Sequence, residues 1–491
     1  MKIVMFAAEA SPYAKVGGLG DVVGTLPKAL EQLGAETTIV APSYYAAHPG
    51  GFDIPRCKAV PGFDIPMGSS IEHAEIYQSR IEGSSVGIYL IGSRRYFNRN
   101  GIYDDPVTGE GYSDNMERFI FFMKAGLELL LRLELPVDII HCHDFHTGLI
   151  PGLIRTNYGD DPCFAGAGTL FTIHNIAYQG IYPRESLYYA GIDLRHFHHS
   201  SPFEYWGRVN FMKAGIALAD KINTVSQTYA AEIQTSPEFG LGLEGVLRSR
   251  AEDLSGIVNG IDYAEWNPET DPFIPARFSS RDLAGKALCK EQLLRDFGLP
   301  LLENNVPLIG IVSRLADQKG FDLVEESVAE IMALNLQVVI LGTGQQKYQE
   351  FFQRLAERYP EKAAVQLSFE NDLAHRIEAG CDMFLMPSKY EPCGLNQLYS
   401  FRYGTVPIVR ATGGLVDTVI PYGDGQGTGF SFAGYSSREM MEAIRQALAV
   451  YSDPVRWRAL MIRGMSQDWS WDRSAKEYMR LYRSIYLRRH K

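Results

Sequence analysis

The sequence predicts an α/β protein of two domains, each built on a largely parallel β-sheet with helices packed on its faces. The chain has 491 residues, about three times the size of a typical single domain. Short apolar runs alternate with longer amphipathic segments, which is the pattern of βα units. An irregular passage rich in proline, residues 267–278, interrupts this pattern, which then restarts. A single larger sheet is the alternative that the pattern leaves open.

The first set of expected strands lies in the N-terminal half of the chain. Several of these apolar runs end in polar residues; the run 137–142, for example, leads into His143 and Asp144. Since ligands of open α/β sheets bind beyond the carboxyl ends of the strands, such residues are candidates for function. The expected strands are residues 2–7, 36–41, 86–91, 137–142, 169–174, 221–225 and 254–258.

A second set of expected strands follows the irregular passage. The last amphipathic segment, residues 471–486, is expected to be a helix. Two sets of about 200 residues each predict two Rossmann-like domains that face a deep cleft, over residues 1–255 and 256–470. The strands of the second set are expected at residues 306–313, 337–341, 364–367, 383–387 and 406–410.

Composition and charge limit the classes of partner and compartment. The net charge of −11 and the pI near 5.6 argue against nucleic acid or an anionic membrane, and an anionic substrate would need a local basic cluster. Six scattered cysteines without a C-x-x-C pair favour free thiols in a reducing compartment. The first apolar run ends at Glu9, too early for a signal peptide or a membrane span, so we expect a cytoplasmic protein, or a plastid protein after removal of a transit peptide.

The first candidate motif is a glycine pair, Gly17 and Gly18, that follows the first expected strand and precedes a helix. Such a loop lets backbone N–H groups approach a phosphate at the positive end of a helix, and Lys15 adds a full charge. The dinucleotide fingerprint G-x-G-x-x-G is not met, because its third glycine position, counted from Gly18, is Val23. A purely structural turn is the alternative for the glycines.

A second motif opens the second half of the chain. Arg314 lies just past the expected strand 306–313, and Lys319 follows in the same loop. Arginine can chelate two oxygens of an anion while lysine acts as a point charge, so the two could bind one anionic group. Two solvated surface cations are the alternative.

A third motif surrounds Glu391 after the expected strand 383–387. Pro392 suits the first position of a helix and Gly404 can end it, so Glu391 is expected at a helix N-terminus beside the amides of Cys393 and Gly394. Such a carboxylate is either a helix cap or an acceptor for sugar hydroxyls.

A second glycine pair, in the stretch 412–415, repeats the design of the first one in the other half of the chain.

Histidines at 141, 143, 146 and 174 raise the question of a metal site, but Asp144 nearby and the absence of a clear second ligand set favour buried, hydrogen-bonded histidines. The chain also has no D-x-D triplet, so a metal-bridged diphosphate site of that kind is unsupported. Charge on a leaving group would then be stabilised by Arg314, Lys319 and the loop amides.

Together these segments resemble the bacterial glycogen synthase and plant starch synthase family. The resemblance runs in order from the N-terminus to beyond residue 430. Each segment is weak alone, but the set is specific. The matching segments are residues 9–19 with a K-x-G-G-L core, 172–175, 258–262, 313–320, 387–397 and 412–418.

The resemblance implies a GT-B fold in which the C-terminal helix, residues 471–491, packs back on the first domain. It implies retaining α-1,4-glucosyl transfer from a nucleotide-diphosphate glucose, usually ADP-glucose, to the non-reducing end of an α-glucan. It implies no cofactor and no metal, and its expected partners are the nucleotide-sugar donor and the α-glucan acceptor. Two alternatives stay open: a sucrose- or trehalose-type transferase of the same fold, and a catalytically silent α-glucan-binding scaffold.

The family's functional residues map onto this chain by matching motif. Lys15, Arg314 and Lys319 match residues that hold the donor phosphates, and Gly18 and the pair Gly413–Gly414 match glycines whose amides approach them. His174 and Glu391 match residues around the transferred glucose, and Asp144 matches an aspartate near the reacting groups. Further expected substrate-binding residues from the same segments are Gly17, Asn175, Asn259, Cys393, Gly394, Thr412 and Leu415.

One departure concerns recognition of the nucleotide ribose. Related retaining transferases carry a second glutamate eight residues after the first. Tyr399 stands at that position here, which fits the synthase family and leaves the ribose contact unassigned.

Overall fold

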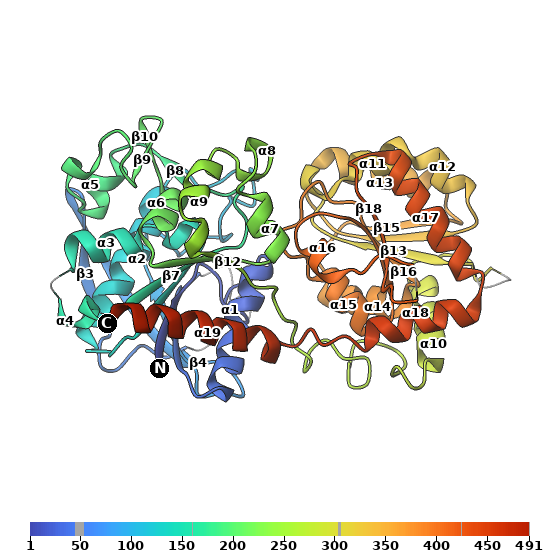
Figure 1. The fold of residues 1–491 in the computed structure, drawn as a ribbon, viewed down its shortest axis with the longest axis horizontal. Helices are drawn as coiled ribbons and strands as arrows, with labels where there is room; N and C mark the ends of the chain where they lie inside the picture. Colours follow the sequence, from blue (N-terminus) through green and yellow to red (C-terminus); the bar gives the residue numbers. More distant parts are fainter. Residues whose placement is uncertain (45–53, 160, 303–305, 424, 491) are drawn as a thin grey trace. The chain divides into compact units, whose positions relative to one another are not determined.

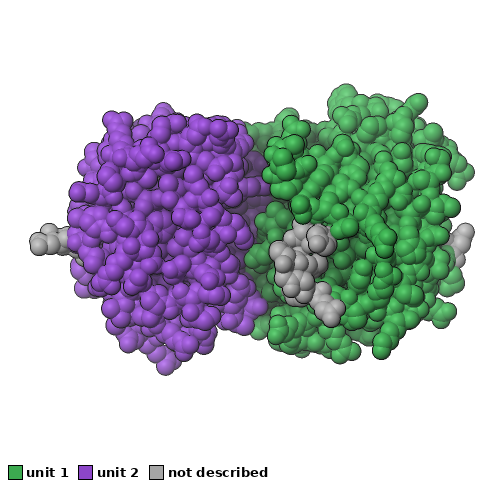
Figure 2. All heavy atoms as spheres, turned by 180° about the vertical axis from the view of Figure 1, so that it is seen from behind, with its two compact units in different colours: residues 1–225, 230–260, 471–491 green, residues 226–229, 261–470 purple. Residues whose placement is uncertain are grey.

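The computed structural model describes residues 1–491 except 45–53, 160, 303–305, 424 and 491. The described chain divides into two compact units (Figures 1 and 2). Unit 1 comprises residues 1–225, 230–260 and 471–491, and unit 2 comprises residues 226–229 and 261–470. The expected boundary after residue 255 falls inside strand β12 (Leu254–Gly256), whose pairing with β11 (Lys221–Thr224) keeps it in unit 1.

Unit 1 is built on a nine-stranded sheet with the order β12-β11-β7-β6-β1-β2-β5-β4-β3. Its strands pair in parallel except for the antiparallel pairs β3·β4 and β4·β5. The hairpin β3 and β4 was not predicted, because one face of it is exposed and its sequence lacks a continuous apolar run. The other bounds are β1 Lys2–Phe6, β2 Glu36–Pro42, β3 Gly62–Met67, β4 Ser70–Arg80, β5 Gly87–Gly92, β6 Ile139–His143 and β7 Gly168–Ile173.

Helices cover both faces of this sheet, and a small sheet of β8 (Ile181–Tyr182), β9 (Glu204–Tyr205) and β10 (Arg208–Asn210) extends the unit. The C-terminal helix α19 (Trp471–Arg489) lies beside α1 (Figure 1) and buries Tyr478, Tyr482 and Ile485 in one core with strands β1, β6 and β7. The other helices are α1 Gly18–Gln32, α2 Asn115–Arg132, α3 Ile150–Asn157, α4 Pro162–Ala165, α5 Ser186–Ala190, α6 Phe211–Leu218, α7 Gln227–Glu232, α8 Pro237–Gly240 and α9 Glu244–Ser249.

Unit 2 has a six-stranded, wholly parallel sheet with the order β15-β14-β13-β16-β17-β18. Its inner strands β13, β14, β16 and β17 are buried on both faces, as in other doubly wound sheets. The strands are β13 Leu308–Val312, β14 Gln337–Leu341, β15 Ala363–Gln366, β16 Met383–Met386, β17 Val406–Arg410 and β18 Phe430–Phe432.

The helices of unit 2 alternate with these strands, as the βα pattern predicted. No helix in the described part of the chain is long and apolar enough to cross a membrane. The helices are α10 Ala284–Asp296, α11 Phe321–Glu326, α12 Val328–Ala333, α13 Gln346–Arg358, α14 Asn371–Gly380, α15 Asn396–Arg402, α16 Gly414–Thr418, α17 Ser437–Tyr451 and α18 Pro454–Met465.

Candidate functional site

The candidate residues gather into one cluster on each unit, and each cluster follows three neighbouring parallel strands. In unit 1 these strands are β7, β6 and β1, except that Asn259 follows the edge strand β12, and in unit 2 they are β13, β16 and β17. Carboxyl ends of adjacent parallel strands share one edge of a sheet, so loops far apart in sequence come together there. Unit 1 holds Lys15, Gly17, Gly18, Asp144, His174, Asn175 and Asn259; unit 2 holds Arg314, Lys319, Glu391, Cys393, Gly394, Thr412, Gly413, Gly414 and Leu415.

The first glycine pair begins helix α1 as predicted, with Gly17 at the N-cap position. The buried carboxylate of Glu9 accepts hydrogen bonds from the N–H groups of Val16 (2.6 Å) and Gly17 (3.0 Å). The Tyr103 hydroxyl donates to the other oxygen of Glu9 at 2.6 Å. Burial raises the pKa of Glu9, and these three donors oppose that shift. Glu9 therefore holds the shape of the loop.

Lys15 lies in the same loop and forms an ion pair with Asp21, with Nζ 2.6 Å from Oδ1. Both side chains keep part of their surface exposed, so the pair can open to another anion. Glu9 and Asp21 were absent from the predicted site. Only their positions in the sequence could have indicated a role in the site. Glu9 follows the first strand at the start of the segment that resembles the family, and Asp21 lies in the first turn of α1.

Asp144 follows strand β6 in a strained backbone conformation, with φ 56° and ψ −178°. Residues other than glycine rarely adopt this region of backbone conformation, and those held in it concentrate at functional sites. Its Oδ1 accepts a hydrogen bond from the His174 N–H at 2.7 Å, so the ends of β6 and β7 are joined through this carboxylate. Burial raises the pKa of Asp144 to about 7, although the N–H donors of His174 and Asn175 act in the opposite direction.

The histidines are hydrogen-bonded to one another and to core residues. His143 Nδ1 lies 2.9 Å from His174 Nε2, and His141 contacts Tyr482 and Thr172. Burial lowers the pKa of His141 and His143 well below the usual value and that of His174 to about 3. All three are neutral at physiological pH. Among the described residues, no group of three or more His, Cys, Asp or Glu side chains has a geometry that could hold a metal ion.

In unit 2, Lys319 and Glu391 form an ion pair, with Nζ 2.7 Å from Oε2. Ser388 donates a hydrogen bond to the same carboxylate oxygen at 2.9 Å. Glu391 is buried and Lys319 is partly exposed, while Arg314, two residues after the end of strand β13, is exposed. The sequence placed Lys319 and Glu391 in separate motifs, and the fold brings them into contact.

The helix expected from Pro392 to Gly404 is wrong in its first turn. Helix α15 begins at Asn396 with Leu395 at the N-cap, so Glu391 is not at a helix N-terminus. The cause is Gly394, whose φ of +71° breaks the helical path. Glu391 is therefore no helix cap, and its carboxylate is held by Lys319 and Ser388 instead.

The second glycine pair begins helix α16, with Gly413 at the N-cap and a φ of +49°. A Cβ atom on Gly413 would lie 2.0 Å from the Glu391 carbonyl oxygen, and one on Gly414 would lie 2.1 Å from that of Cys393. The Gly414 N–H donates to the Glu391 carbonyl at 3.0 Å. Only glycine permits this approach, so these residues bring the two loops together.

The remaining predicted site residues are mostly buried. Leu415, Thr412 and Cys393 have exposed fractions of 1%, 1% and 6%, so any ligand contact of Leu415 would come from its backbone. Asn175 Oδ1 accepts the Ala177 N–H at 3.0 Å and shapes the turn after β7. Asn259, after β12, is also buried, and its Oδ1 has no hydrogen-bond partner among the described residues.

Tyr399 is part of an aromatic stack in the core of unit 2. Its ring lies 3.8 Å from that of Trp266 at an angle of 13°, and His375 stacks on the other face of Trp266 at 3.8 Å and 9°. This packing explains an aromatic residue at a position where related transferases carry a glutamate.

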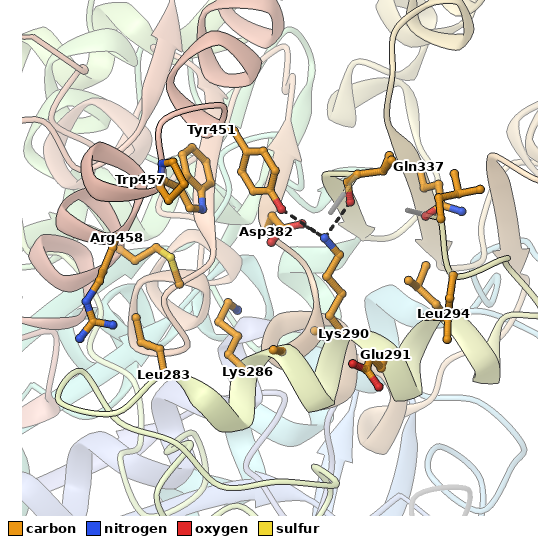
Figure 3. A pocket seen from close by; sticks show the side chains of 17 residues that line it. Leu283, Lys286, Lys290, Glu291, Leu294, Gln337, Asp382, Tyr451, Trp457 and Arg458 are labelled. Carbon is orange, nitrogen blue, oxygen red and sulfur yellow. Dashed lines mark hydrogen bonds and ion pairs between the residues drawn. The ribbon is translucent and has the colours of Figure 1, made fainter. Parts of the chain in front are cut away.

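A pocket of about 520 Å³ in unit 2 does not belong to this site (Figure 3). Its lining includes Gln337, the first residue of β14, and Asp382, which directly precedes β16. These positions mark the amino ends of the strands, the edge opposite the candidate site. In the pocket Lys290 Nζ binds Asp382 Oδ2 (2.7 Å) and the Tyr451 hydroxyl (3.2 Å), so its charge is already neutralised.

Two protein-family models match the chain. The model described as the starch synthase catalytic domain matches residues 2–249, and that of glycosyl transferases group 1 matches residues 298–459. The glycogen synthase of Koribacter versatilis is 46% identical over 485 residues, covering 98% of each chain. That of Geotalea daltonii is 44% identical over 487 residues, covering 99% of each chain.

Two solved structures also match this chain over nearly its whole length. The catalytic domain of starch synthase IV from Arabidopsis thaliana, bound to ADP and acarbose, matches with a TM-score of 0.91 and 33% identity over 99% of each chain. A sucrose-phosphate synthase from Thermosynechococcus elongatus matches with a TM-score of 0.61 at 18% identity over 99% of each chain, which is a likeness of fold alone.

Proposed function

This chain belongs to the glycogen and starch synthase family, so it is a glucosyltransferase that elongates an α-glucan, and we propose that its donor is ADP-glucose. The Arabidopsis starch synthase is bound to ADP, which supports this choice over UDP-glucose. The main support for assigning donor binding to the residues of unit 2 is the contact of Lys319 with Glu391 beside the second glycine pair. A cation, a carboxylate and loop amides thus lie in one cluster.

In this proposal Arg314 and Lys319 bind the donor diphosphate. Lys319 already neutralises an anion, the Glu391 carboxylate, so a diphosphate would compete for the same ammonium group. Once Lys319 turns to the phosphate, Glu391 keeps its hydrogen bond from Ser388 and becomes an acceptor for glucose hydroxyls. Lys15 acts in the same way in unit 1, exchanging Asp21 for a phosphate oxygen.

The reaction we propose proceeds with retention at the glucose C1 atom. The bond from C1 to the diphosphate oxygen breaks, the acceptor 4-hydroxyl attacks from the same face, and its proton passes to a phosphate oxygen of the departing ADP. Negative charge grows on the diphosphate in the transition state, where Arg314 and Lys319 stabilise it. Loss of one such donor typically costs about 10²–10³ in rate. Asp144 and His174 act near the reacting sugar.

We propose that transfer needs neither a metal nor a cofactor, because these cations and loop amides supply the charge that a metal would supply. The bacterial relatives support a cytoplasmic location. The two substrates are the expected partners, namely the nucleotide sugar and an α-glucan.

Initial rates with ADP-glucose and UDP-glucose on a glycogen primer test the donor, with a chelator in a parallel reaction. We expect incorporation into glycogen from ADP-glucose, unchanged by the chelator. Glucose transferred to a free monosaccharide acceptor instead would favour a sucrose- or trehalose-type transferase. The variants Lys319→Ala and Arg314→Ala, measured beside the exposed-cation variant Arg438→Ala, test the phosphate contacts; full activity in both site variants would refute them.

A further inference from the structure

A buried hydrogen-bond network links the C-terminal helix α19 to the strands that carry the site in unit 1. His141 Nδ1 lies 2.8 Å from the Tyr482 hydroxyl, and His141 Nε2 lies 2.6 Å from the Thr172 hydroxyl. Thr172 donates its proton to the Asn223 side-chain oxygen at 2.5 Å, and Asn223 donates to the Tyr478 hydroxyl at 3.1 Å. The direction of every bond in this network can therefore be assigned.

The assignment starts at Thr172. A hydroxyl has one proton, and that of Thr172 goes to Asn223, so Thr172 can only accept from His141. His141 Nε2 therefore carries the ring proton. Burial keeps His141 neutral, so its Nδ1 is unprotonated and accepts the proton of the Tyr482 hydroxyl. The network fixes both the tautomer and the orientation of His141.

His143 packs against this fixed ring, with ring centroids 4.0 Å apart. Its Nδ1 faces His174 Nε2 at 2.9 Å, and its Nε2 is buried without a hydrogen-bond partner among the described residues. A proton on His143 Nε2 would be a buried N–H without an acceptor, which folded proteins avoid more strictly than an unused lone pair. The proton therefore lies on His143 Nδ1 and is donated to His174 Nε2.

We propose that His143 is a positioning residue that fixes His174 as the tautomer protonated on Nδ1, so that His174 presents an N–H donor to a sugar oxygen. A neutral imidazole whose Nε2 accepts a hydrogen bond must carry its proton on Nδ1. His174 then polarises or orients an oxygen of the transferred glucose and does not accept a hydroxyl proton. The role of His174 at the sugar rests on the proposed function; the tautomer does not.

Nitrogen-15 NMR of the full chain with labelled histidine reads the tautomer directly, because protonated and unprotonated ring nitrogens have separate shifts. The His174 signals are identified by their loss in His174→Gln. We expect a protonated Nδ1 and an unprotonated Nε2 on His174 in the free protein. A proton on His174 Nε2 would overturn the proposal. This result does not depend on whether the protein transfers glucose, so it is separate from a failure of the proposed function.

Two variants of His143 test the effect on the reaction. Asparagine can place an amide N–H near the position of the His143 Nδ1–H, whereas leucine cannot donate. We expect His143→Leu to lower kcat about tenfold with little change in the KM for ADP-glucose, and His143→Asn to recover most of that loss. The exposed-histidine variant His198→Leu is the control and should match the wild type.

The NMR spectrum also separates a positioning role from a structural one. In folded His143→Leu, we expect the His174 proton to appear on both ring nitrogens or to move to Nε2, and in His143→Asn to stay on Nδ1. Equal kcat in the two variants, or an unchanged His174 tautomer in His143→Leu, would overturn the proposal.

Discussion

Replacing Asp144 with asparagine tests what burial of this carboxylate does to stability and to the reaction. Asp144 has an exposed fraction of 8%, and burial raises its pKa from 3.8 to about 7. Asparagine keeps the size of the side chain and an oxygen that can accept the His174 N–H, but it carries no charge. The two proteins therefore differ in the charge of one buried group.

The sign of the effect follows from the direction of the shift. The folded-state pKa lies above the unfolded one, so between about pH 4 and pH 7 the folded state binds more protons, and the free energy of unfolding of the wild type falls as the pH rises. From about pH 5 to about pH 8 the free energy of unfolding of the wild type falls by roughly 2.5 kcal/mol for this reason. The Asp144→Asn variant lacks the titrating carboxyl group, so its free energy of unfolding does not fall in this way. The variant should gain stability relative to the wild type as the pH rises.

Urea unfolding of both proteins at about pH 5 and pH 8, followed by circular dichroism, measures this difference. A stability difference that does not change between the two pH values would refute the assigned burial shift. In the same preparations, glucose transfer by Asp144→Asn should fall by about 10²-fold, and the wild-type rate should rise with pH through about 7 as the carboxylate ionises. A gain in stability with a loss of activity would identify Asp144 as a residue kept for function.

Three further predictions concern the loops and the core. Glu9→Gln should raise the KM for ADP-glucose roughly tenfold with little change in kcat, because the single oxygen of glutamine cannot serve both the two loop N–H groups and the Tyr103 hydroxyl; an unchanged KM would contradict the role of Glu9 in shaping the loop. Gly414→Ala should lower the unfolding free energy by about 3 kcal/mol through its clash with a carbonyl, whereas Gly245→Ala, in open space, should not, as urea unfolding can show. Tyr482→Phe should cost about 1–3 kcal/mol in unfolding free energy, since His141 Nδ1 would lose its donor; a stability equal to the wild type would contradict the assigned network.

The sequence by itself determined the βα pattern, because buried parallel strands need short, continuous apolar runs. Strands β14 and β17 agree with the expected residues, and both glycine pairs begin helices as predicted. The signal is local in each case: an apolar run, or a glycine pair directly before an amphipathic segment. The antiparallel hairpin β3 and β4 gave no such signal, because part of it faces solvent.

The types of residue in the site were also available from the sequence, together with their place after the strands. Their partners were not. The pairing of Lys319 with Glu391 joins residues 72 positions apart, and it depends on β13 and β16 being neighbours in the sheet. Strand order is set by packing of the whole unit, which no local pattern specifies.

The conformation around Glu391 shows where a local rule failed. Proline after a carboxylate is a valid signal for a helix start, but Gly394 adopts a positive φ, and the Gly414 N–H binds the Glu391 carbonyl from another loop. The same holds in unit 1, where the protonation of Asp144 and the tautomer of His174 depend on burial and on His143. The sequence thus determined which groups are present after which strands, and the tertiary structure alone decided their charge, their proton positions and their contacts, because these depend on neighbours brought together by the fold.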